Sequence, residues 1–154
     1  MGADNIAEFS AALAGREAIE KFVEEVAPGL LSIDAKALMQ AFRTLLSPVD
    51  AAAISQHLAS YLIDAMQEGI RDSRAGWIDD DLTFTTPWGF DPNQIQTPLL
   101  LLHGEQDRFV PFAHGKWLAS KINTVEARLS TEDGHLTLSS QRIPEVHAWL
   151  LSKM

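Results

Sequence analysis

The chain has 154 residues, of which 46% are apolar, and this is enough for a compact domain with a sizeable core. Its formal net charge of −9 repels phosphate backbones and anionic lipid surfaces, which argues against nucleic-acid and membrane partners. The absence of cysteine excludes disulfides, thiolate metal sites and a cysteine nucleophile; with no signal-peptide pattern and no membrane-length apolar run, it predicts a cytoplasmic protein.

The first part of the chain, residues 1–75, has the periodicity of amphipathic helices, because apolar side chains recur every three or four positions. Each such helix buries only one stripe, so the helices must pack against each other or against another part of the protein. Four helices are expected, over residues 5–15, 16–27, 34–46 and 50–69.

Capping residues and helix breakers set the expected ends of these helices. Pro28-Gly29 should end the second helix. Asp34 and Asp50 should be the N-caps of the third and fourth, because a carboxylate accepts backbone N–H groups that lack a partner in the first turn. The fourth helix should end at Gly69 or soon after.

Residues 76–97 lose the helical period and are rich in glycine, proline, aspartate and aromatic residues, so we predict a connecting segment. The consecutive acids Asp79 to Asp81 would point in different directions, unlike the alternating ligands of a calcium loop, and are expected in a solvated loop. Trp77, Trp88 and Phe90 are candidates for a substrate pocket, with ordinary core or interface packing as the alternative.

Residues 98–154 change period. Leu99 to Leu102 are apolar at every position, which is typical of a parallel strand with both faces covered. A helix should start near Pro111, an alternating edge strand should cover 125–129, and a last helix should span 144–151. The side chains expected to face inward from the two helices are Trp117, Leu118, Ile122, Val146, Trp149 and Leu150.

Asp107 and His135 each follow a predicted strand, and the carboxyl ends of parallel strands meet at one edge of a sheet. We therefore expect the two side chains to lie together, with the carboxylate orienting a histidine that acts as general base. Gly134 should allow a tight turn before His135. His57, His103, His114 and His147 are expected in turns or on helix surfaces, and no metal-ligand spacing is present, so we infer neither metal nor cofactor.

The segment His103 to Pro111, "HGEQDRFVP", and the pair Gly134-His135 together resemble the α/β-hydrolase superfamily, in which the acid follows a strand as "hGxxDxxvP" and the histidine follows the last strand. The segment Gly104 to Ala119, "GEQDRFVPFAHGKWLA", is especially similar to uncharacterised bacterial hydrolases of this superfamily, and the resemblance covers about residues 98–151. The resemblance implies that Asp107 and His135 belong to a catalytic triad, that the fold is α/β, and that the preceding helices form a cap.

The family's nucleophile elbow, G-x-S-x-G, is absent, so we expect this chain to be the carboxyl-terminal portion of a hydrolase of esters, amides or related bonds. Alone it should be inactive, while the longer parent would act on a small molecule through a serine or aspartate nucleophile. A two-stranded sheet would expose an apolar edge, so self-association through that edge or the cap helices is expected. The alternative is a non-enzymatic helical interaction module or a degenerate hydrolase-like protein.

Overall fold

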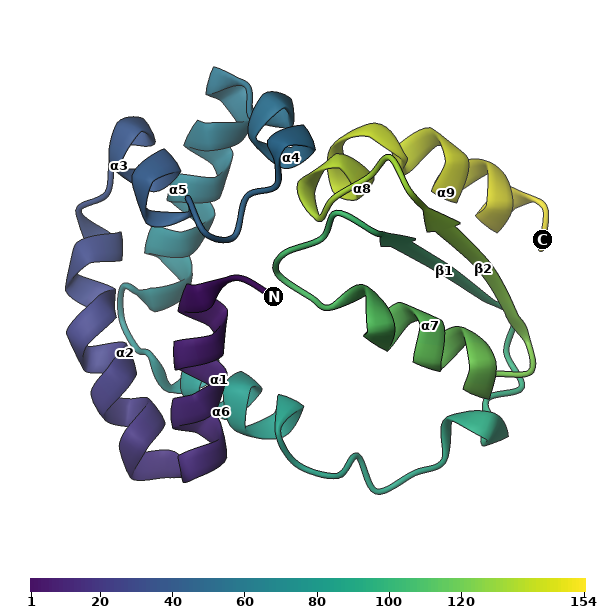
Figure 1. The fold of residues 1–154 in the computed structure, drawn as a ribbon, viewed down its shortest axis with the longest axis horizontal. Helices are drawn as coiled ribbons and strands as arrows, with labels where there is room; N and C mark the ends of the chain where they lie inside the picture. The colour runs from purple at the N-terminus through teal and green to yellow at the C-terminus, as the bar shows by residue number, and fades with distance from the viewer. The chain divides into compact units, whose positions relative to one another are not determined.

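Five helices form one of the two units into which residues 1–154 of the computed structural model divide (Figure 1). This helical unit comprises Gly2–Thr44 and Ile54–Trp88, and the other, the α/β unit, comprises Leu45–Ala53 and Gly89–Met154 together with Met1. None of the helices has the length and apolar character needed to cross a membrane. The helices of the helical unit are α1 (Ala3–Ala14), α2 (Arg16–Leu31), α3 (Ala35–Ala41), α5 (Gln56–Ile70) and α6 (Ala75–Phe84).

The predicted periodicity of α2 is confirmed by its burial. Ile19, Val23 and Ala27 recur every four positions and are completely buried, in one cluster with buried apolar residues of α1, α5 and α6. A second cluster joins α3 and α5 through Leu38 and Ala59. Each fully buried valine, leucine or isoleucine side chain contributes about 1.5–3 kcal/mol, so these clusters stabilise the helical unit.

The predicted end of α2 at Pro28-Gly29 is wrong, because the helix continues to Leu31 with Pro28 inside it. Pro28 cannot donate a backbone hydrogen bond within the helix, but its side chain lies on the exposed side of α2. Leu30 and Leu31 in the last turn pack against the buried cluster of α2, and Leu30 also packs against the second cluster. Tertiary burial of these leucines therefore outweighs the local breaker.

Helices α3 and α5 begin at side-chain caps, only one of which was predicted. Asp34 caps α3 as expected, since its carboxylate accepts the N–H of Ala37 at 2.7 Å. Ser55 rather than Asp50 caps α5, through the N–H of Leu58. The predicted helix over 34–46 is also too long: α3 ends at Ala41, and the chain leaves the helical unit after Thr44.

The predicted connecting segment over 76–97 is wrong in its first part, because Ala75–Phe84 forms helix α6. Ile78 is buried in the core of the helical unit. Leu82, one helical turn later, packs against the same buried cluster. The aspartates expected in a solvated loop are therefore helical. Asp81 is only 5% exposed, on the side of α6 that faces α1.

The α/β unit is built on a two-stranded parallel sheet, in which Leu99 pairs with Val125 and Gly104 with Ser130. Figure 1 shows α7 (Phe112–Lys121) on one face of the sheet and α9 (Ile143–Leu151) on the other. The predicted strands and their parallel pairing are thereby confirmed. The elements of the unit are α4 (Pro48–Ala53), a short 3-10 helix (Pro92–Gln94), β1 (Leu99–Gly104), α7 (Phe112–Lys121), β2 (Val125–Ser130), α8 (Leu136–Gln141) and α9 (Ile143–Leu151).

Two of the side chains predicted to face inward are exposed. Ile122 and Trp149 are buried as expected, but Trp117 in α7 and Leu150 in α9 are 47% and 51% exposed. In addition, α8 was not predicted. Its six residues are too few to show a helical period in the sequence, and its start depends on groups from elsewhere in the chain.

Candidate functional site

Asp107 is held by the turn that follows β1. Its side chain is buried, and its Oδ1 atom accepts hydrogen bonds from the backbone N–H groups of Phe109 and Val110, both at 2.8 Å. These two bonds close the turn before α7 and fix the plane of the carboxylate. The second oxygen, Oδ2, is thereby aimed at the loop after β2.

The same contacts determine the ionisation of Asp107. Burial opposes ionisation, but it is outweighed by the hydrogen bond from His135, the N–H groups of Val110 and Phe109, and the electrostatic interaction with the His135 side chain. The pKa of Asp107 therefore lies below its ordinary value. The carboxylate is charged at neutral pH and accepts hydrogen bonds at both oxygens.

His135 follows β2 and faces this carboxylate. Its Nδ1 atom lies 2.9 Å from Asp107 Oδ2, and because the carboxylate is ionised, Nδ1 carries the proton and donates. The ring of Phe109 stacks on the imidazole, with centroids 4.5 Å apart and an interplanar angle of 25°. The side chain of His135 is 42% exposed, so the far side of the ring is accessible. The predicted adjacency of Asp107 and His135 is thus confirmed.

Two glycines allow the loops after β1 and β2 to approach closely. A Cβ on Gly104 would lie 2.2 Å from the carbonyl oxygen of Asp133, and a Cβ on Gly134 would lie 2.2 Å from a carboxylate oxygen of Asp50. Gly134 was expected to serve a tight turn, but its φ is not positive. It is required because the Asp50 carboxylate occupies the space of a side chain.

His103, predicted to stabilise a turn, lies behind Asp107. The ring is buried between β1 and α7, edge-on to Phe112, and a Cβ on Gly115 would lie 2.4 Å from its Nδ1 atom. Its Nε2 atom lies 3.3 Å from the carbonyl oxygen of Val110 and 3.7 Å from Asp107 Oδ2. His103 therefore supports the Asp107 turn from inside the α/β unit.

An apolar pocket of about 490 Å³ opens beside the paired side chains. Asp107, His135 and His103 form its polar end, and its walls come from β1, α8, α9 and the turn before α7. An apolar lining with a few converging polar groups is typical of a site for a small organic molecule. The apolar residues that line it are Leu102, Val110, Leu136, Leu138, Ile143 and Val146.

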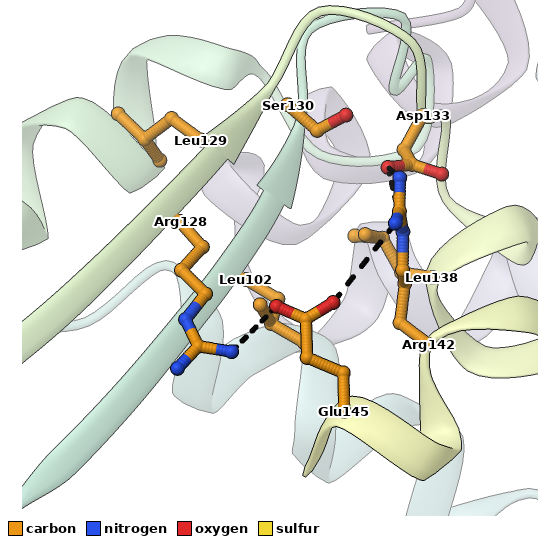
Figure 2. A pocket seen from close by; sticks show the side chains of 8 residues that line it. All are labelled: Leu102, Arg128, Leu129, Ser130, Asp133, Leu138, Arg142 and Glu145. Atoms are coloured by element: carbon orange, nitrogen blue, oxygen red, sulfur yellow. Dashed lines mark hydrogen bonds and ion pairs between the residues drawn. The ribbon is translucent and has the colours of Figure 1, made fainter. Parts of the chain in front are cut away.

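A second hollow, of about 210 Å³, lies beside β2 and α9 and is lined by charged residues (Figure 2). Arg142 pairs with Asp133 at 2.7 Å and with Glu145 at 3.9 Å, and Arg128 pairs with Glu145 at 2.6 Å. Each arginine already has a carboxylate partner, so the hollow offers no free cation for an anionic ligand. The chain of ion pairs instead anchors Asp133, two residues before His135.

The three aromatic residues proposed for a substrate pocket lie in different parts of the chain. Trp77 and Trp88 belong to the helical unit, where Trp77 donates from Nε1 to Glu8 at 2.6 Å and Trp88 is exposed. Phe90 belongs to the α/β unit, is exposed, and is not among the residues that line the apolar pocket. The surface positions expected for His57, His114 and His147 are confirmed.

Sequence reasoning missed two residues that contact His135. Phe109, whose ring stacks on the imidazole, lies two positions after Asp107, so the turn in "DRFVP" could have indicated it. Asp50 accepts the backbone N–H of His135 at 3.0 Å from 85 positions away. No local signal in the sequence connects Asp50 with this loop.

The site can orient a base and stabilise its charged form, but it holds no activated nucleophile. Ser139, the serine that lines the apolar pocket, donates its hydroxyl to the carbonyl oxygen of Leu136 at 3.1 Å and makes no hydrogen bond to His135. No group of three or more potential metal ligands is present in the chain. In comparisons with known proteins, no family model, curated protein or solved structure matches this chain.

Proposed function

We propose that this chain is the carboxyl-terminal portion of a cytoplasmic α/β-hydrolase that cleaves esters, amides or related bonds. Asp107 and His135 are its acid and base, and the nucleophile comes from residues outside these 154. The observation that carries the proposal is the 2.9 Å contact between His135 Nδ1 and Asp107 Oδ2, at the carboxyl ends of two parallel strands and beside an apolar pocket.

In the proposed reaction, Asp107 holds the imidazole with its proton on Nδ1, which leaves Nε2 as the basic nitrogen. Nε2 removes the proton of the attacking hydroxyl and later returns it to the leaving group. The Asp107 carboxylate stabilises the imidazolium formed in between. If the nucleophile is an aspartate, Nε2 instead activates the water that hydrolyses the intermediate.

The pocket favours a neutral substrate with an apolar acyl group. Its only charged or titratable side chains are those of the site itself, and its walls are aliphatic. Without a nucleophile, the chain cannot form a covalent intermediate. We therefore expect para-nitrophenyl butyrate hydrolysis by this chain to equal the background rate.

The decisive experiment compares this chain with a longer protein that includes the upstream in-frame residues. We expect the longer protein to hydrolyse para-nitrophenyl butyrate, with His135→Ala lowering kcat by about 1,000-fold or more. His114→Ala, which removes an exposed histidine of α7, is the control and should leave kcat unchanged. A longer protein that neither hydrolyses esters nor reacts with a fluorophosphonate, and carries no aspartate nucleophile, would favour the non-enzymatic interaction module.

Self-association is part of the proposal, because the outer edge of β1 has no partner strand in the two-stranded sheet. Leu99 to Leu102 on this strand are only partly buried. We expect the isolated chain to form dimers or larger assemblies through this edge or through the helices of the helical unit. Light scattering at micromolar concentration tests this, and a single monomeric species would contradict it.

A further inference from the structure

Asp50 is a completely buried carboxylate, 0% exposed, in the α4 segment of the α/β unit. Its Oδ2 atom accepts the hydroxyl of Ser47 at 2.8 Å and the backbone N–H of His135 at 3.0 Å. Its Oδ1 atom accepts the N–H groups of Leu136 at 2.8 Å and Thr137 at 3.2 Å. Three of these four donors are therefore backbone groups at the start of α8.

His135 occupies the N-cap position of α8, but its side chain is hydrogen-bonded to Asp107 and makes no bond to the first N–H groups of the helix. A residue at this position usually satisfies the first N–H groups of a helix with its own side chain. Asp50 supplies the missing acceptors, and its negative charge suits the positive end of the helix.

We propose that Asp50 is a positioning residue for His135, holding the histidine backbone so that the imidazole reaches Asp107. The consequence for hydrolysis rests on the proposed function, but the positioning of the ring does not. The direction of the imidazole ring depends on the position of the His135 backbone. Asp50 fixes this backbone by accepting hydrogen bonds from the N–H groups of His135, Leu136 and Thr137. Loss of these bonds would let α8 begin elsewhere and would lengthen the 2.9 Å contact with Asp107.

The test measures the rate at which the His135 Nδ1 proton exchanges with water, by NMR of the chain with nitrogen-15-labelled histidine. The signal of this proton is identified by its loss in His135→Ala. In Asp50→Asn, a side chain of similar size replaces one of the two acceptor oxygens with an amide N–H₂, which faces other donors. We expect this proton to exchange about tenfold faster than in the unchanged chain. An unchanged exchange rate in a folded Asp50→Asn chain would overturn the proposal.

Asp34→Asn is the control, because Asp34 also accepts a backbone N–H in the first turn of a helix, that of Ala37 in α3, but has no contact with His135. It should leave the His135 proton unchanged. If Asp50→Asn does not fold, Ser47→Ala removes the hydroxyl that donates to Asp50 Oδ2 and accepts the Asp50 backbone N–H, and we expect a rise in exchange of about threefold. No rise in that variant would overturn the proposal as well.

The longer protein separates the two proposals. If it hydrolyses esters, Asp50→Asn should lower kcat about tenfold with KM changed by less than about twofold. Faster exchange in a protein without hydrolysis would retain the positioning role and reject the proposed function. Hydrolysis that is unaffected by Asp50→Asn would reject the positioning role alone.

Discussion

Replacing Asp81 with asparagine is expected to raise the free energy of unfolding at about pH 8 by about 3 kcal/mol. Asp81 is buried on the α1-facing side of α6, and its Oδ2 atom has no hydrogen-bond partner. Burial and the neighbouring carboxylate of Glu8 raise the pKa of Asp81 to about 7, and Asp80 adds to this. Asparagine has a similar shape and carries no charge, so it removes the cost of an ionised group at this position.

The direction of the pH dependence follows from the raised pKa. Between the unfolded value, 3.8, and about 7, folded Asp81 holds a proton that the unfolded chain has lost. Its contribution to stability is therefore greatest below the unfolded pKa and declines as the pH rises through about 7. The gain from Asp81→Asn should be small at about pH 4 and largest above pH 7.

Urea denaturation followed by circular dichroism at about pH 4 and about pH 8 measures the free energy of unfolding of Asp81→Asn and of the unchanged chain. Asp80→Asn is the control, because Asp80 is the exposed neighbour of Asp81 on the same helix. We expect it to change the free energy of unfolding by less than about 0.5 kcal/mol. Equal stability changes for Asp81→Asn at both pH values would show that the charge of Asp81 carries no such cost.

Gly104→Ala is expected to lower the free energy of unfolding of the α/β unit by about 3 kcal/mol. The new Cβ would lie 2.2 Å from the carbonyl oxygen of Asp133 and 2.6 Å from that of Gly134. Both atoms are backbone, so relief requires the loop after β2 to move away from the loop after β1. The same movement would break the hydrogen bond from Gln106 N–H to Asp133 and separate His135 from Asp107.

Two measurements test this prediction together. Urea denaturation gives the loss of stability, and the NMR signal of the His135 Nδ1 proton reports the separation of the paired side chains. Gly69→Ala is the control, because Gly69 lies within α5 and a Cβ there would meet no atom within 4 Å, so alanine should be neutral or stabilising. A Gly104→Ala chain of unchanged stability would mean that the two loops adjust without cost.

The sequence predicted those features that depend on neighbours along the chain. The apolar spacing of Ile19 and Val23 predicted α2, and the uninterrupted leucines of β1 predicted a strand covered on both faces. The positions of Asp107 and His135 after two strands predicted their contact, because parallel pairing alone brings the ends of neighbouring strands together.

Only the tertiary structure decided the features that depend on distant partners. The composition of residues 76–97 favours a loop, but burial of Ile78 stabilises α6, and burial of Leu30 and Leu31 extends α2 beyond Pro28. Asp50 has the residue type and position of an N-cap for the helix that follows it, yet it caps α8, far along the chain. Local patterns report which groups need a partner, whereas packing between distant segments determines which partner each group obtains.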